Sequence, residues 1–374
     1  MLNAHTTTNH LRRLASVTML VIVLGASHAL ATGAILDVVN HVSQTNYEHY
    51  LRDQLFTHTG DNRGYGAQHD PARTNIFDLF DNFGLRPVLD GFPYSGHTYY
   101  NVVATLPGTT ARSNQLYIIG AHYDSVNNPG ADDNASGVAG VLEAARVLSQ
   151  YRFEATLVFV AFDREEDYLI GSTDFATKHA ADDIRGMISI DMIAWNGTSN
   201  HPEIYGRSAS DPIKLALSNS VALYGDGLTA SVYGRFDASD HVPFESRGFQ
   251  ACFLYEGGDN PYYHTSVDTV DTAGYIDYAF ASKMTRATVG WLATQAGLVG
   301  PRQPPPLQFA RGSGNLAVAW PTNATGFKLM FATNLVAQID WSPVPETVQT
   351  NGTNFTVQLS TGAAPRRFYR LQWW

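Results

Sequence analysis

Histidine and carboxylate residues occur together in five short segments of this 374-residue chain. The segments contain His122 with Asp124, Asp132 with Asp133, Glu165 with Glu166, Asp191, and His264 with Asp268. Imidazole nitrogens and carboxylate oxygens form the ligand mixture that suits zinc. One such pair on a surface loop would ordinarily be solvated charge, but five segments in one chain predict a metal centre.

The number and adjacency of the acids indicate hydrolysis assisted by more than one ion. Two cations held close together need a shared anion, which a bridging carboxylate supplies. Glu165 and Glu166 are neighbours, and neighbouring side chains that leave a strand point in different directions. One can therefore bind a metal while the other faces a reacting water. A metal pair activates that water and stabilises the alkoxide formed when it attacks a carbonyl.

Short apolar runs precede most of these segments and are typical of buried strands. The runs are Gln115–Gly120, Thr156–Phe162, Gly186–Met192 and Gln250–Tyr255. Between the first two runs, Ala135–Ser149 carries apolar residues at helical spacing. This alternation predicts an α/β domain with a mixed, largely parallel central sheet flanked by helices. Because ligands bind outside the carboxyl ends of parallel strands, we expect the five segments to meet there.

The segments also carry a family resemblance. The order and spacing of HYDS at 122–125, GADDNASG at 130–137, Glu165-Glu166, Asp191 and His264 resemble the co-catalytic di-zinc aminopeptidases. These are the secreted bacterial leucyl-type aminopeptidases and the related transferrin-receptor-like zinc exopeptidases. The resemblance covers roughly residues 35–298 and implies the zinc exopeptidase fold, followed here by a small all-β domain.

The resemblance implies a site with two zinc ions per chain. One ion would be bound by His122 and Asp191, the other by Glu166 and His264, with Asp133 as the bridge. Glu165 would be the general base, and Asp124 would fix the orientation of His122. Asp268 would orient His264. The implied activity is hydrolysis of the N-terminal bond of peptides or proteins.

One position departs from the family pattern. Better-known relatives have a tyrosine near the segment 239–241 that polarises the substrate carbonyl, and the nearest residue here is Phe236, which cannot donate a hydrogen bond. His241 or Tyr233 could take that role, so the donor stays open.

Two other functions are compatible with the fold. Glutaminyl-peptide cyclotransferases share it and have similar HYDS and paired-acid motifs, but they bind one zinc. The Asp132-Asp133 turn favours two metals and hydrolysis. Some receptor-like members have lost their ligands, and the intact ligand set argues against that alternative.

The N-terminus has the pattern of an export signal. Arg12 and Arg13 precede an apolar run over 14–26, and Ala29-Leu30-Ala31 supplies the small residues of a cleavage site. The run is shorter than the ~20 residues that span a bilayer. We therefore expect residues 1–31 to be a signal peptide, the protein to be secreted or periplasmic, and no stable membrane insertion after cleavage. The single cysteine, Cys252, excludes an intrachain disulfide.

A proline-rich segment at 301–306 is the expected linker between two domains. Residues 32–300, the expected peptidase domain, contain 16 basic and 32 acidic residues, whereas residues 307–374 contain five basic and two acidic residues. The latter show short alternating apolar runs and an Asn351-Gly352 turn, which predict a small β domain. Attachment to a surface or glycan and a passive accessory role are both open for it. The net charge of −10 argues against a nucleic-acid partner.

Overall fold

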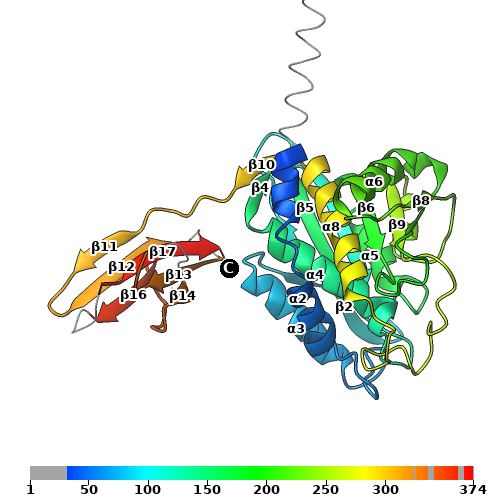
Figure 1. Cartoon of the computed structure of the whole chain (residues 1–374), viewed down its shortest axis with the longest axis horizontal. Helices are drawn as coiled ribbons and strands as arrows, with labels where there is room; N and C mark the ends of the chain where they lie inside the picture. Colours follow the sequence, from blue (N-terminus) through cyan, green and yellow to red (C-terminus); the bar gives the residue numbers. More distant parts are fainter. Residues whose placement is uncertain (1–31, 323, 325, 336–340, 361–365, 374) are drawn as a thin grey trace, which may run out of the picture.

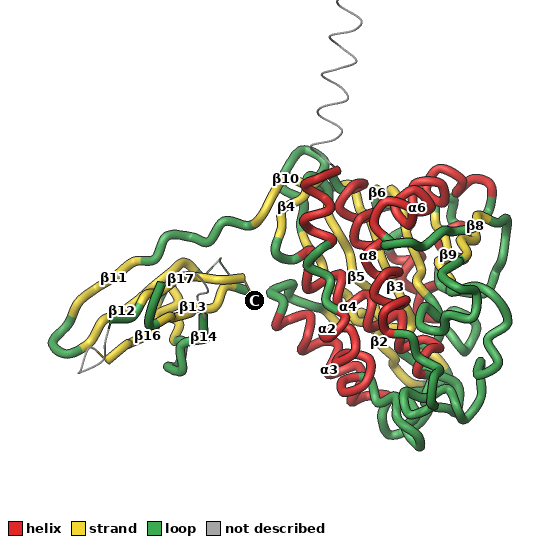
Figure 2. The backbone as a smooth tube through the Cα atoms, viewed as in Figure 1, coloured by secondary structure: helices red, strands yellow, loops and turns green. Residues whose placement is uncertain are grey.

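The computed structural model describes residues 32–322, 324, 326–335, 341–360 and 366–373. The expected signal peptide, residues 1–31, lies outside this range. Figures 1 and 2 show helices grouped around a central sheet, and a separate set of strands formed by the C-terminal residues. None of the described helices combines the length and apolar character that crossing a membrane requires.

The central sheet has eight strands in the order β1-β2-β5-β3-β6-β9-β7-β8. Their bounds are Val88–Tyr94 (β1), His97–Leu106 (β2), Gln115–His122 (β3), Thr156–Phe162 (β5), Asp183–Ile190 (β6), Glu203–Tyr205 (β7), Ser231–Val232 (β8) and Ala251–Tyr255 (β9). The four strands β5, β3, β6 and β9 run parallel to one another. Their carboxyl ends therefore share one edge of the sheet, while β1, β2 and β7 join antiparallel neighbours.

Helices cover both faces of this sheet. They are Gln44–His49 (α2), His69–Asn82 (α3), Gly137–Leu148 (α4), Ile170–Lys178 (α5), Asp211–Tyr224 (α6), Val242–Glu245 (α7) and Tyr278–Gln295 (α8), with single turns at Tyr50–Gln54 (η1), Ala131–Ser136 (η2) and Ser208–Ser210 (η3). Residues 32–39 are also helical. Helices α2, α3, α4, α6 and α8 contribute to one hydrophobic core, and α5 and α7 to the other.

Alternation along the strands explains the two cores. Ile119 of β3 and Phe159 of β5 belong to the core under α4 and α8, whereas Ile118 and Val160 belong to the core under α5 and α7. Successive side chains of a strand point to opposite faces, so a strand buried on both faces is apolar throughout. This is why the central strands appear in the sequence as unbroken apolar runs.

The C-terminal residues form two antiparallel sheets, in the orders β11-β12-β16-β15 and β14-β13-β17. The strands are Gln308–Arg311 (β11), Asn315–Pro321 (β12), Phe327–Ala332 (β13), Ser342–Pro343 (β14), Gln349–Asn351 (β15), Asn354–Ser360 (β16) and Phe368–Trp373 (β17). Side chains from both sheets, including Val318, Val357 and Leu329, share one small core. Gly352 adopts a positive φ of 60° in the β15–β16 turn, directly after Asn351, the last residue of β15.

The predicted fold class is confirmed, with small differences at element ends. The helix predicted from Ala135 begins at Gly137, because the preceding residues form the turn η2. The strand predicted to extend to Met192 ends at Ile190, so Asp191 lies just beyond it. Pro301 is part of a short strand, Leu298–Pro301 (β10), which pairs with Tyr151–Phe153 (β4).

Candidate active site

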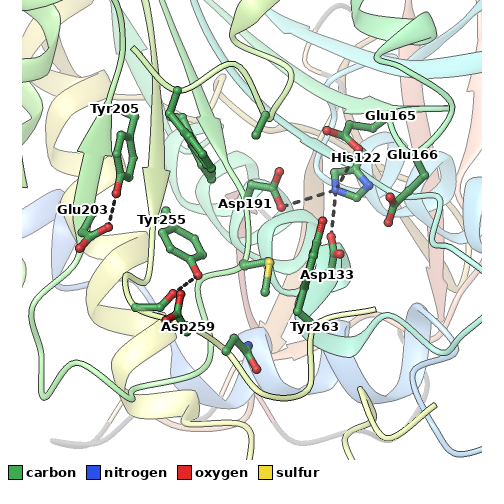
Figure 3. A pocket seen from close by; sticks show the side chains of 16 residues that line it. His122, Asp133, Glu165, Glu166, Asp191, Glu203, Tyr205, Tyr255, Asp259 and Tyr263 are labelled. Carbon is green, nitrogen blue, oxygen red and sulfur yellow. Dashed lines mark hydrogen bonds and ion pairs between the residues drawn. The ribbon is translucent and has the colours of Figure 1, made fainter. Parts of the chain in front are cut away.

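The five predicted metal ligands lie together at the carboxyl edge of the parallel strands. Figure 3 shows four of them, His122, Asp133, Glu166 and Asp191. His122 is the last residue of β3, and Asp191 follows the last residue of β6. Glu166 lies in the loop after β5, Asp133 in the turn before α4, and His264 in the loop after β9. The sheet thus brings together residues that are up to 142 positions apart, as His122 and His264 are.

These ligands form two groups that share Asp133. In the first group, Nε2 of His122 lies 3.3 Å from Oδ1 of Asp133 and 3.5 Å from Oδ1 of Asp191. In the second, Nε2 of His264 lies 3.0 Å from Oδ2 of Asp133 and 3.2 Å from Oε2 of Glu166. Each oxygen of Asp133 therefore faces a different histidine, which is the arrangement of a bridging carboxylate.

The donor set fits divalent zinc. Buried oxygens of Asp133, Glu166 and Asp191 have no hydrogen-bond partner. Leaving a buried carboxylate oxygen without a partner is costly, and a cation coordinated by these atoms would remove that cost. Two imidazoles with three carboxylates are nitrogen and oxygen ligands of the kind zinc accepts.

The carboxylates close to His122 and His264 raise the pKa of both imidazoles. Burial disfavours the charged form of His122, but the negative charges of Glu165 and Asp191 outweigh it and raise the pKa of the imidazole well above its ordinary value. The adjacent carboxylates of Asp133 and Glu166 raise the pKa of His264 to about 10. A metal ion and a proton compete for the same imidazole nitrogens, so metal binding here would release protons.

Asp124 contacts the first group at Nδ1 of His122, the ring nitrogen that does not face the other ligands. Nδ1 of His122 lies 3.2 Å from the backbone carbonyl oxygen of Asp124 and 3.5 Å from its Oδ1. The same carboxylate accepts hydrogen bonds from the backbone N–H groups of Glu165 and Glu166, at 3.2 and 3.3 Å. Asp124 therefore contacts one predicted ligand of each group, His122 and Glu166, as well as the predicted base Glu165.

Glu165 faces the cavity beside the first group. Its Oε2 lies 4.0 Å from Nε2 of His122, farther than either ligand oxygen of that group. Burial and repulsion from nearby acids, including Asp240 and Asp191, raise the pKa of Glu165 well above its ordinary value, against the attraction of His122. Its ligand atom also lies within 4.8 Å of those of His122 and Asp191, so a direct metal contact is geometrically open to it.

A buried arginine that the sequence did not single out ties the two ligand loops together. Arg63 is fully buried, and its guanidinium donates hydrogen bonds to the carbonyl oxygens of Tyr123, Pro129 and Gly130. Gly130 has a positive φ of 57°, and a Cβ there would collide with the carbonyl oxygen of Asp133. The loop that presents Asp133 is thus packed too tightly for any side chain at this glycine.

Asp268 supports a different ligand from the one predicted. Its carboxylate accepts hydrogen bonds from the backbone N–H groups of Asp132 and Asp133, at 2.8 and 3.3 Å. Asp132 in turn accepts from the backbone N–H of Ala194 at 2.9 Å. Both acids therefore hold the loop that presents Asp133, whose next peptide bond, to Asn134, is cis.

The structure also places His241 and Tyr233, the two residues that could replace the carbonyl-polarising tyrosine absent from this sequence. Phe236 lines the cavity, but His241 is fully buried, stacks on Phe253 with a ring separation of 5.7 Å, and has its pKa lowered to about 4 by burial. Tyr233 stacks on Tyr205 at 5.1 Å and is not among the residues that line the cavity. Neither alternative therefore presents a donor to the cavity.

Tyr263 is a cavity-lining residue with a hydroxyl group that sequence reasoning did not assign. It lines the cavity, and its ring stacks on His264 with a centroid separation of 3.8 Å. Burial and the negative charges of Asp133 and Glu166 raise its pKa, so the phenol keeps its proton. Figure 3 shows Tyr263 beside Asp133. Its place immediately before a predicted ligand was the available signal.

Comparisons with known proteins agree with this geometry. The model of peptidase family M28 matches residues 101–291, just over half of the chain. A probable leucine aminopeptidase of Trichophyton verrucosum is 31% identical over 219 residues, which cover 53% of this chain and 56% of that protein. The chain thus spans just over half the length of this relative.

Two solved structures share the fold. The LapA aminopeptidase of Legionella pneumophila superposes with a TM-score of 0.60 at 19% identity, over 70% of this chain and 74% of LapA. The glutaminyl cyclase of Macrostomum lignano superposes with a TM-score of 0.61 at 18% identity, over 71% of this chain and 93% of the cyclase. These likenesses show the architecture and do not distinguish the two activities. The family match, together with the ligand geometry, identifies the chain as a member of peptidase family M28.

Proposed function

We propose that this protein is a zinc-dependent aminopeptidase, a metallo-exopeptidase that hydrolyses the N-terminal bond of peptides or proteins with two zinc ions per chain. The observation that carries the proposal is the pair of ligand groups that share Asp133, with Glu165 facing the same cavity beside them. A centre of this kind has the positive charge and the base that amide hydrolysis needs.

Each side chain of the centre has a distinct task. His122, Asp133 and Asp191 would hold one ion, and Asp133, Glu166 and His264 the other. When bound, the ions supply Lewis acidity toward a water and the substrate carbonyl. Glu165 accepts a proton from the attacking water and passes it to the departing amine. Tyr263 donates a hydrogen bond to the carbonyl oxygen as negative charge develops there.

A matched pair of substitutions tests this division of tasks. Glu165→Gln is expected to keep both zinc ions and to lower kcat by ~10²–10⁴-fold, the range typical of a lost general base. Glu166→Gln removes the same charge from the neighbouring residue and is expected to lose one zinc ion. Zinc per chain by metal analysis and hydrolysis of aminoacyl anilides are the two readouts. Loss of zinc from Glu165→Gln would make Glu165 a ligand and overturn its assignment as the base.

The same measurements separate the proposed activity from its alternatives. One zinc per chain together with cyclisation of N-terminal glutamine would establish the cyclotransferase function instead. Absence of tightly bound zinc together with no hydrolysis of the anilides would favour a receptor-like role. The second ligand group, His264 with Glu166, favours hydrolysis because it supplies ligands for a second ion beside the first.

We further propose that the protein acts outside the cytoplasm, as a secreted or periplasmic enzyme. The support is the export pattern at residues 1–31, and N-terminal sequencing of the exported protein is expected to begin at Thr32. Attachment of residues 307–374 to a surface or glycan stays a prediction. Retention of the full chain on isolated cell-envelope material, compared with its retention on an inert matrix, would test it.

A further inference from the structure

The cavity at the metal centre extends well beyond the ligands. It has a volume of about 550 Å³, and its lining includes Glu203 and Asp259, which belong to neither ligand group. Figure 3 shows these two acids on the opposite side of the cavity from His122 and Glu166. The space between these two acids and the metal ligands is large enough for a substrate side chain. The residues that line this space determine which side chain fits.

Pairing of two strands builds the wall between the acids and the ligands. In the antiparallel pair β7–β9, Glu203 lies opposite Tyr255, and Tyr205 lies opposite Phe253. Since side chains alternate along a strand, these four residues share one face, and the intervening Ile204 points into the core. The cavity therefore receives an acid and three aromatic rings from one small patch of sheet.

The aromatic wall is packed against itself. Tyr205 contacts Phe236 with ring centroids 5.0 Å apart, and Phe253 contacts Tyr255 at 5.6 Å. Such rings accommodate the methylene groups of a long side chain, and their faces also attract a cation. The wall alone fits either an apolar side chain or the stem of a cationic one, so the charge at its far end decides between them.

The two acids at the far end are not neutralised by the protein. Glu203 accepts a hydrogen bond from the hydroxyl of Tyr205 at 2.5 Å, which orients the carboxylate. Asp259 is exposed to the cavity and solvent. Among the described residues neither acid forms an ion pair, and the residues that line the cavity include no Lys or Arg. The nearby Arg207 and Arg235 both pair with Asp237 instead.

The charge balance with metal leaves this end negative. Two divalent ions carry as much positive charge as the four acids around them supply negative charge, namely Asp133, Glu165, Glu166 and Asp191. Glu203 and Asp259 remain as surplus negative charge in a partly enclosed cavity, where a cation is attracted more strongly than in bulk water.

We propose that this cavity selects substrates whose N-terminal residue is Lys or Arg, with the methylene stem along the aromatic wall and the cationic head at Glu203 and Asp259. The inference rests on the proposed aminopeptidase function and names its preferred substrate class. The substrate α-ammonium does not compete for this position. It is attached to the carbon next to the scissile carbonyl, so it stays at the end of the cavity where Glu165 and the ligands lie.

The test compares lysyl with norleucyl anilide, because the two side chains have similar stems and differ in charge. We expect a higher kcat/KM for the lysyl substrate. Glu203→Gln and Asp259→Asn are each expected to lower the lysyl-to-norleucyl ratio by about threefold to fivefold, and the double variant by about tenfold, as for partly exposed ion pairs. Norleucyl hydrolysis should change much less than lysyl hydrolysis, because the norleucyl side chain carries no charge. Asp226→Asn, in an exposed turn outside the cavity, is the charge-matched control and should alter neither rate.

Different results would overturn the proposal in recognisable ways. A preference for norleucine, or a ratio that the double variant leaves unchanged, would show that the cavity takes an apolar side chain. Equal losses for both substrates would mean that the acids bind the α-ammonium or support the fold. Calorimetric binding of lysinamide against norleucinamide reports the preference without turnover. If no anilide is cleaved but lysinamide still binds more tightly, then the proposed function fails and the cationic site stands.

Discussion

The two histidine groups of the metal centre differ sharply in how the protein holds them. The side chain of His122 is 1% exposed, whereas that of His264 is 34% exposed. His122 ends a central strand and has Asp124 at its Nδ1, but Nδ1 of His264 has no hydrogen-bond partner among the described residues. One ligand is thus fixed by the sheet and by a second acid, and the other chiefly by its loop.

This difference follows from where each ligand lies in the chain. Hydrogen bonds to both neighbouring strands fix the position of β3, and Arg63 ties the loop after it to the loop that presents Asp133. His264 has a positive φ of 56° in an irregular loop, and its main side-chain support is the ring of Tyr263. We infer that the His122 group is the preorganised half of the centre and that the His264 group depends more on the ion itself.

Loss of the shared ligand Asp133 should weaken metal binding in the His122 group and in the His264 group alike. Because each oxygen of Asp133 faces one histidine, Asp133→Asn weakens both groups at once. We expect fewer than one zinc ion per chain and a fall in kcat of about 10³-fold or more, since a catalytic ion contributes several kcal/mol. Metal analysis and anilide hydrolysis measure the two effects. Retention of both ions by this variant would mean that Asp133 is not the bridge.

The next largest effect should be confined to the His264 side. Tyr263→Phe removes the hydroxyl while keeping the ring that stacks on His264. We expect kcat to fall by about 10²-fold, as when one donor to a developing oxyanion is lost, with KM changing much less. Zinc content should stay at the wild-type value. A variant with unchanged kcat would exclude Tyr263 as the donor and leave only its stacking role.

Much of this centre could be predicted because its ligands lie next to regular elements. His122 and Asp191 adjoin strands whose apolar runs are unmistakable, and the edge they share follows from the parallel arrangement. The same rule predicts that Glu165 and Glu166, which follow β5, lie at this edge. Local patterns and the geometry of an open sheet predict that these residues lie close together, whereas the role of each one was implied by the family resemblance.

The residues that were missed act through contacts that no local pattern encodes. Arg63 lies in an irregular segment, and three of its hydrogen bonds go to backbone carbonyls 60, 66 and 67 positions away, which carry no sequence signature. The pairing that places Glu203 opposite Tyr255 involves a strand of three residues, too short to show a period. The family resemblance implied that Asp268 orients His264, but its carboxylate accepts hydrogen bonds from the backbone of the Asp133 loop.

A smaller effect is expected on the His122 side. Asp124→Asn removes the negative charge that faces Nδ1 of His122 while preserving the shape of the side chain. We expect the affinity of the first group for zinc to fall by about 10- to 100-fold, as for other acids that orient a ligating histidine. Competition with a chromogenic chelator measures the affinity of each ion separately. Equal weakening of both ions would mean that the hydrogen bond of Asp124 with the Glu166 backbone matters as much as its contact with His122.

The smallest expected effect is the difference in zinc affinity between the two histidine groups, which can be measured in the unmodified protein. If preorganisation separates the two groups, stepwise chelation should remove the ions in two phases whose affinities differ by about tenfold, with the more exposed His264 group losing its ion first. His264→Ala provides the assignment, because it should abolish the weaker phase and leave the tighter one unchanged. A single phase in the unmodified protein would mean that burial at the strand end does not raise the zinc affinity of the His122 group. Loss of the tighter phase in His264→Ala would mean the same. The shared carboxylate would then couple the two ions more strongly than their surroundings separate them.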